Sequence, residues 1–338
     1  MRKGINPEKF KTELAISSYH RIVIPVYIPN LEGYFKDSLK ILKLCIGSLL
    51  KSINFQTRIT LYNNNSHTSV KDYLDDLYAT ESQIDQVFHS KENVGKINAI
   101  LAATKGNLEP LITIADADVL FKQNWQEEVE KVFNNFKYAG MVSPVPSSKA
   151  YNNFTASNWF YGFFKGKLKF ENVINPSEMK MFEDSLELNY TLYQKIHLEK
   201  YLTLQNNLGK AVMGCGHFVA TLKREIFDLG SNSPALHKIV GGVENKFIDK
   251  PNEDLGFLRL STLDNYAFHM GNTYESWMQN KYNLLQLNNS RSVYKNLDKI
   301  YKLRKINILI GKAISRILKR KKIKNLYFHT LEMKNKNY

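Results

Sequence analysis

The sequence is poor in several features that mark whole classes of protein. Two of its 338 residues are cysteines, Cys45 and Cys215, which excludes a disulfide framework and a cysteine-based zinc site. No apolar run approaches the roughly 20 residues of a membrane-spanning helix. The first six residues, Met1 to Asn6, are followed by mainly polar residues, so the apolar core of a signal peptide is missing. Together these absences predict a cytoplasmic protein.

A strong excess of one charge sign is also missing from most of the chain. The net charge is +15, but residues 291–338 hold fifteen lysines and arginines against two acidic residues. The preceding 290 residues hold 32 basic and 30 acidic side chains. A basic excess confined to one terminal segment indicates a tail that meets an anionic surface. Nucleic-acid binding by that tail is an alternative, although no nucleic-acid-binding module is visible, so no nucleic-acid partner is expected.

Short apolar strands alternate with amphipathic helices over the first half of the chain. Apolar runs of strand length occur at 21–27, 57–62, 85–89 and 111–115, with helical spacing over 36–53. This alternation predicts an α/β fold with a Rossmann-like, mostly parallel sheet flanked by helices. The predicted parts are an arm at 1–18, a domain at 19–290 with a helical or irregular insertion at about 150–210, and a basic helical tail at 291–338.

The strand at 111–115 is followed by two carboxylates one residue apart, Asp116 and Asp118. Side chains at i and i+2 point to the same side of an extended strand, so both can present oxygens toward one point. Two close carboxylates repel each other, and a hard divalent cation removes that cost. An acidic turn is the structural alternative, since aspartate is common in turns.

Polar clusters follow three of the predicted strands, at 63–66, 93–96 and 116–118. In doubly wound sheets, ligands gather beyond the carboxyl ends of the strands. Each cluster alone is ordinary loop chemistry, which asparagine, glycine and serine supply anyway. Their shared position favours a nucleotide site along one edge of the sheet.

Six short motifs follow one another along the chain. They are Ile24-Pro25-Val26-Tyr27, Asn63-Asn64-Asn65-Ser66, Asn93-Val94-Gly95-Lys96, Asp116-Ala117-Asp118, Gly241-Gly242 with Glu244, and Glu253-Asp254 followed by Arg259. In this order they resemble the motifs of family 2-type glycosyltransferases of the GT-A fold, over residues 20–272. The resemblance implies an inverting, nucleotide-sugar-dependent glycosyltransferase of the hexosyltransferase class.

The resemblance also implies a set of donor-binding residues. Nucleotide contacts fall to Pro25, Val26, Tyr27, Asn63, Asn93, Gly95, Lys96 and Asp116. Asn63 stands where many members carry an aspartate that contacts the base. Asp118 would bind Mn²⁺ or Mg²⁺, and His269 matches a position that reaches the metal or the diphosphate in some members. An isolated histidine is otherwise more often a packed core residue, so the assignment of His269 depends on the resemblance.

On the acceptor side, the resemblance makes Asp254 the general base and gives Glu253 a place in the acceptor pocket. A capped helix start is the structural alternative for this pair. The predicted reaction moves a sugar from a nucleotide-diphosphate sugar, most commonly a UDP-sugar, to a hydroxyl of a glycan or lipid-linked acceptor in surface polysaccharide synthesis. A sugar nucleotidyltransferase is an alternative, but its glycine-rich loop is missing after Tyr27. The account requires Asp118 and Asp254 to share one cleft.

Apolar residues recur at spacings of three and four within 292–324, and lysines and arginines flank them. The stripe consists of Leu303, Ile306, Ile310, Ile314 and Ile317. This pattern is typical of an amphipathic helix on an anionic membrane, which would hold the protein peripherally on the inner face of the membrane. The alternative is a helix that packs the stripe on the catalytic domain and leaves a solvated basic face.

Overall fold

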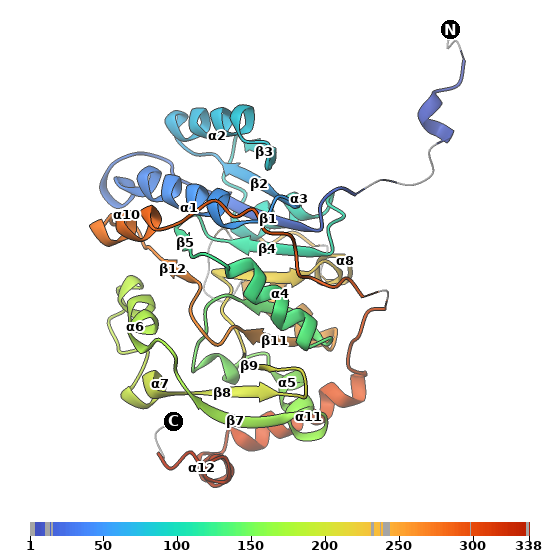
Figure 1. Ribbon diagram of the computed structural model, residues 1–338, viewed down its shortest axis with the longest axis vertical. Helices are drawn as coiled ribbons and strands as arrows, with labels where there is room; N and C mark the ends of the chain where they lie inside the picture. Colours follow the sequence, from blue (N-terminus) through green and yellow to red (C-terminus); the bar gives the residue numbers. More distant parts are fainter. Residues whose placement is uncertain are drawn as a thin grey trace.

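A ten-stranded mixed sheet flanked by helices runs through the computed structural model (Figure 1). The structure describes residues 4–10, 14, 16–230, 233–236, 238, 244–297, 299–335 and 338. In spatial order the strands are β3 (Ile84–Ser90), β2 (Thr57–Asn64), β1 (His20–Val26), β4 (Leu111–Ala115), β10 (Val219–Lys223), β6 (Ala139–Ser143), β11 (Leu258–Ser261), β9 (Lys210–Met213), β8 (Lys200–Gln205) and β7 (Lys167–Asn172).

Most strands of this sheet run in one direction. β1 pairs in parallel with β2 and β4, and β2 does so with β3. β6 and β11 are also parallel, whereas β10, β9 and β7 run against the other seven strands. A separate two-stranded pair joins β5 (Val119–Phe121) to β12 (Ala267–His269). This architecture confirms the predicted α/β fold with a mostly parallel sheet.

Helices cover both faces of the sheet, because successive side chains of a strand point to opposite sides. Ile22 and Ile24 of β1 belong to the same core cluster as residues of α1 (Ser38–Ser52) and α4 (Trp125–Asn135). Val23 instead packs with α3 (Lys96–Thr104) and α8 (Glu225–Leu229). Burial on both faces explains the continuous apolar sequence of the central strands. Further helices are α2 (Thr68–Thr80), α5 (Ala156–Phe164), α6 (Pro176–Ser185), α7 (Lys195–Glu199), α9 (Lys250–Asp254) and α10 (Ser276–Asn283).

The predicted insertion at about 150–210 extends the sheet. It supplies the antiparallel pair of β7 and β8, together with α5, α6 and α7. Its aromatic side chains Tyr151, Trp159 and Phe170 are buried in the main core. These three aromatic residues therefore fill a core, whereas Phe163 and Phe164 of the same region are 42% and 61% exposed.

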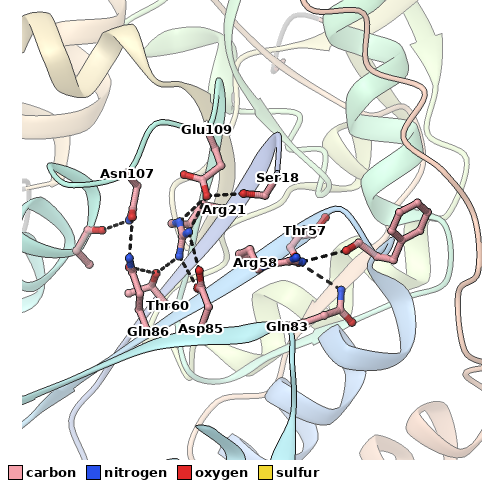
Figure 2. A network of polar contacts seen from close by, with 12 residues as sticks. Ser18, Arg21, Thr57, Arg58, Thr60, Gln83, Asp85, Gln86, Asn107 and Glu109 are labelled. Carbon is pink, nitrogen blue, oxygen red and sulfur yellow. Dashed lines mark hydrogen bonds and ion pairs between the residues drawn. The ribbon is translucent and has the colours of Figure 1, made fainter. Parts of the chain in front are cut away.

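A network of charged and polar side chains lies where β1 and β3 begin and just before β4 (Figure 2). Arg21 donates to Glu109 (Nη2···Oε1 2.6 Å) and to Asp85 (Nη1···Oδ1 2.7 Å), and Ser18 donates to Glu109 (2.7 Å). Burial alone would raise the pKa of Glu109, but the hydrogen bonds from Arg21 and Ser18 outweigh it and lower that pKa. The network pairs charges that would be costly to bury alone, so its role is structural.

The basic C-terminal segment packs on the body at the β7 end of the sheet, away from α2 and β3 (Figure 1). It forms α11 (Lys305–Leu318) and α12 (Lys321–Thr330). The side chain of Tyr338 is buried, and its hydroxyl donates to the Ser148 carbonyl at 3.0 Å. Among the described residues, no helix has the length and apolar character that crossing a membrane requires.

Candidate active site

A cavity of about 450 Å³ opens at the carboxyl ends of β1, β2 and β4. Tyr27, Tyr34 and Phe35 form an aromatic part of its wall. The polar part consists of Ser38, Asn64, Asn93, Lys96, Asp116, Asp118, Glu244 and Asn272. An apolar wall facing a few convergent polar groups is the usual composition of a small-molecule site. The cavity lies where the sequence predicts the nucleotide.

The predicted donor-binding residues divide between this cavity and its supports. Pro25, Tyr27, Asn93, Lys96 and Asp116 line the cavity. Val26 is instead fully buried in the core. These positions follow from the alternation along β1 and its exit, which turns neighbouring side chains in opposite directions.

Asn63 lies one residue away from the side chain that reaches the cavity. It is buried, its amide contacts His89 Nδ1 at 2.9 Å, and its Oδ1 accepts the Ser66 N–H at 2.9 Å. The next residue, Asn64, lines the cavity, and its amide donates to Asn93 Oδ1 at 2.9 Å. The structure thus gives Asn64 the cavity-facing place and Asn63 a role in holding the loop.

Gly95 marks the start of α3 beside the cavity. Its φ of +85° is a conformation that favours glycine, and it is the N-cap of the helix that begins with Lys96. Free amides at the start of a helix attract anions. Gly95 is not among the residues that line the cavity. Any contribution of Gly95 to donor binding would therefore come from the backbone conformation that starts α3.

Lys96 connects two carboxylates across the cavity floor. Its Nζ lies 2.5 Å from Asp116 Oδ1 and 3.6 Å from Glu244 Oε1. Burial alone would lower the pKa of Lys96, but the neighbouring acids, first Asp116, outweigh it and raise that pKa. These acids therefore favour the charged form of Lys96. Glu244 belongs to a motif of the resemblance, but sequence reasoning gave it no role.

Asp118 and His269 meet because β5 pairs with β12. His269 lies opposite Val119 in this pair, and the Met270 N–H donates to the Asp118 carbonyl at 2.8 Å. His269 Nε2 is 3.4 Å from Asp118 Oδ2, and His269 Nδ1 contacts Ser185 Oγ at 2.9 Å. A hydroxyl on the far ring nitrogen is the arrangement that orients a metal-binding histidine.

The other oxygen of Asp118 tests whether these residues fit a metal. Asp118 Oδ1 is buried, and within the described part of the chain it has no hydrogen-bond partner. Burial, the largest influence, raises the pKa of Asp118 to about 6. A divalent cation would satisfy the orphaned oxygen. No group of three or more histidine, cysteine or acidic residues forms a metal cage in the described ranges. Mg²⁺ and similar ions need no such cage where substrate phosphates and water complete the shell.

Glu253 and Asp254 lie outside the cavity. Glu253 Oε2 accepts the Ala156 N–H at 2.8 Å, at the start of α5. Asp254 contacts Lys250, and its Oδ1 lies 3.3 Å from Nζ of Lys312 in α11. Burial would raise the pKa of Asp254, but these two lysines outweigh it and lower that pKa. In this conformation Asp118 and Asp254 do not share one cleft.

A further buried acidic residue, Asp249, is not among the residues that line the cavity. Asp249 ends a π-helical turn at Asn245–Asp249, with Oδ1 2.9 Å from Arg259 Nη2 and Oδ2 3.2 Å from His217 Nδ1. Both Asp249 and Arg259 are buried. The Arg259 of the resemblance therefore holds this turn in place. Gly241-Gly242, which precede the turn, lie outside the described residues.

The family model described as Glycosyl transferase family 2 matches residues 22–228. The match covers more than half of the chain and contains the cavity-lining residues from Pro25 to Asp118. The chain belongs to glycosyl transferase family 2 and is an enzyme of the transferase class. A comparison with curated proteins finds no match.

Solved structures of glycosyltransferases show a distant likeness. GalNAc-T7 with UDP, GalNAc and Mn²⁺ aligns at 16% identity with a TM-score of 0.46, over 75% of this chain and 43% of that one. S. aureus TarS 1–349 aligns at 10% identity and 0.42, over 74% and 60%. The mannosyltransferase PcManGT from Pyrobaculum calidifontis, in complex with GDP-Man and Mn²⁺, aligns at 13% and 0.41, over 75% and 56%. The chain thus spans 43% to 60% of the length of these proteins, and the family assignment rests on the family model.

Proposed function

We propose that this enzyme transfers a sugar from a nucleotide-diphosphate sugar, with UDP as the expected nucleotide, to a hydroxyl of a glycan or lipid-linked acceptor. The observation that carries the proposal is the buried, unpartnered oxygen of Asp118, a residue that lines the cavity at the carboxyl ends of β1, β2 and β4. Surface polysaccharide synthesis is the expected setting. A lipid-linked acceptor would bring the enzyme to a membrane, and residues 291–338 are the segment that we expect to meet it.

The donor would occupy the cavity with its diphosphate toward Asp118. Asp118 and His269 would hold Mn²⁺ or Mg²⁺, with Asp116 beside them. A bound divalent ion supplies positive charge to the leaving diphosphate. Lys96 adds a fixed cation, and the amides at the start of α3 add donors for phosphate oxygens. Tyr27 and Asn64 would contact the nucleoside part, since they line the same cavity.

In the transfer, the acceptor oxygen attacks the anomeric carbon while the bond to the diphosphate oxygen breaks. A carboxylate of the protein takes the proton of the acceptor hydroxyl. We propose Asp254 for this role, as the resemblance implies, which requires that its exposed ion pairs with Lys250 and Lys312 open and that Asp254 moves to the cavity, outside which this structure places it. Such pairs contribute little to stability, so opening costs little. Glu244 is the rival, because it already lines the cavity.

Two conservative variants separate these candidates. Loss of a general base lowers the rate by about 10²–10⁴-fold. We expect Asp254→Asn to show that loss in sugar transfer while the affinity for the nucleotide, measured by calorimetry, stays within a few-fold. Glu244→Gln serves as the matched variant and is expected to keep most of its turnover. If Glu244→Gln is the inactive one and Asp254→Asn turns over normally, the base is Glu244.

A further inference from the structure

Helix α11 carries apolar side chains on two opposite sides. One side packs on the body, where Ile308, Gly311 and Leu318 are buried. Gly311 lies so close to the Ala156 carbonyl of α5 that a Cβ would collide with it. The packed side is thus fixed by a backbone-to-backbone approach that leaves no room for rotation of the helix about its axis.

The other side of α11 has no partner in the described part of the chain. Ile306, Leu309 and Ile317 are 59%, 60% and 49% exposed, and Ile310 is also exposed. These positions recur at intervals of three, four and seven residues, so they form one stripe on a helix of about 3.6 residues per turn. We call Ile306, Leu309, Ile310 and Ile317 the outer stripe. Neighbouring helices α5 and α12 add exposed Phe164 and Leu326.

Positive charge accompanies the outer stripe. Lys305, Lys312, Arg316 and Lys319 lie along α11, and Arg320, Lys321 and Lys322 follow it. The sequence has no acidic residue from Lys299 to Leu331. Of these cations, Lys312 faces acids of the body, Asp254 and Glu253. The outer stripe therefore stands in a strongly basic surrounding.

We propose that the outer stripe of α11 inserts into the interface of an anionic lipid bilayer, with the surrounding lysines and arginines on the lipid headgroups. An exposed apolar stripe with basic flanks is the surface that binds such bilayers. A second copy of this chain is a poorer occupant, because two such basic surfaces would repel each other. The sequence left open whether this helix lies on a membrane or packs on the catalytic domain. In the structure, α11 packs one side on the body and presents an apolar stripe on the other side.

The position of Lys312 gives this surface a functional consequence that rests on the proposed function. Lys312 belongs to α11 and reaches Glu253 and Asp254, at 3.8 and 3.3 Å. The acids proposed for the acceptor side therefore lie directly against the membrane-binding helix. A membrane surface at α11 would bring a lipid-linked acceptor to that side of the enzyme.

Co-sedimentation of the full chain with vesicles tests the proposal. Wild-type protein is expected to bind phosphatidylcholine vesicles that contain phosphatidylglycerol, and to bind pure phosphatidylcholine much less. The variant Leu309→Glu/Ile317→Glu is expected to lose about tenfold in partitioning for each substituted residue. Its matched control is Leu287→Glu, at a side chain that is 73% exposed outside α11, which should bind as the wild type does.

A second variant tests the charge. Lys305→Gln/Arg316→Gln/Lys319→Gln should weaken binding to the anionic vesicles by roughly tenfold or more and reduce its sensitivity to salt. Release of nucleoside diphosphate from the donor should remain unchanged in both variants, so a failure of the proposed function is visible separately. Equal sedimentation of the wild type and the outer-stripe variant would overturn the proposal. The proposal would also fail if the wild type were a dimer that binds no vesicles and the outer-stripe variant were a monomer, because the stripe would then be a dimer interface.

Discussion

In the proposed reaction, Asp118 is the residue on which the chemistry of the site depends most. Its replacement by asparagine removes the charge that a divalent cation would need, while the buried volume stays the same. We expect Asp118→Asn to weaken the Mn²⁺-dependent binding of UDP by about tenfold to a hundredfold or more. Mutation of residues that only hydrogen-bond to metal ligands already has effects of about that size. Titration calorimetry with and without Mn²⁺ measures it.

The matched control for this prediction is Asp228→Asn. Asp228 is exposed at the end of α8 and pairs with Arg224, away from the cavity. The Asp228→Asn protein should bind UDP as the wild type does. Undiminished Mn²⁺-dependent binding in Asp118→Asn would remove Asp118 from the proposed metal site.

His20 makes the stability of the protein depend on acid. It is fully buried between Thr113 Oγ1, 2.6 Å from Nε2, and the Gln126 amide, 2.7 Å from Nδ1. Burial lowers the pKa of His20 from 6.5 to about 3. Below pH 6.5, His20 therefore becomes protonated in the unfolded chain but stays neutral in the folded chain until the pH nears 3. His20 thus stabilises the fold above that pH, and this contribution is lost progressively as the pH falls toward 3.

We expect the free energy of unfolding to fall by up to about 1.4 kcal/mol per pH unit for this one histidine below its unfolded pKa. Urea unfolding of the wild type and of His20→Gln at a series of pH values checks it. His197, whose pKa burial lowers to about 4, leaves a residual slope in the variant. An identical pH dependence in the two proteins would contradict the assignment to His20.

Single residues show both the reach and the limits of sequence reasoning. Asp118 and Lys96 both line the cavity, at the edge of the sheet where the sequence predicts them, because a strand end fixes where its following residues stand. Asn63 and Asn64 could not be told apart, because a shift of one residue along a strand reverses the side to which a side chain points. Asp254 was expected in the cleft, but its partner Lys312 stands 58 residues away. No local pattern reveals that contact.

At the scale of elements, α11 shows what helical periodicity leaves open. Apolar spacing predicted the helix, and the structure confirms it at Lys305–Leu318. A helix with two apolar sides has the same spacing as a helix with one, so the packed side could not be identified. The small size of Gly311 and the backbone of Ala156 decide it.

Gly311→Ala therefore tests how α11 is docked. A Cβ there collides with a carbonyl group of α5, which cannot yield as a flexible side chain would. We expect a loss of about 1–3 kcal/mol in stability and faster proteolysis of the chain between α10 and α11. Thermal unfolding and limited proteolysis measure these effects.

Gly106→Ala is the control for that substitution, because a Cβ at Gly106 meets nothing within 4 Å. It should leave both the stability and the proteolysis pattern unchanged. A Gly311→Ala protein as stable and as resistant as the control would show that the contact between α11 and α5 is not formed in solution.

At the scale of the whole molecule, the class of fold followed from the alternation of strands and helices, whereas the direction of single strands did not. β10 enters antiparallel between β4 and β6, and β7 to β9 build an antiparallel end on the sheet. Apolar patterns report burial and say nothing of strand direction. The insertion predicted at about 150–210 forms part of this antiparallel end of the sheet, and its apolar pattern did not reveal these strands or their direction.

The central claim is that the cavity at the end of β1, β2 and β4 binds a nucleotide-diphosphate sugar with a divalent cation and cleaves it. The most direct measurement is the release of UDP or GDP from a panel of nucleotide sugars by the full chain, with Mn²⁺ and with EDTA. The account predicts slow release from one donor, which EDTA stops and Asp118→Asn lacks. Release that is the same in EDTA and in Asp118→Asn, or no release from any donor, would contradict it.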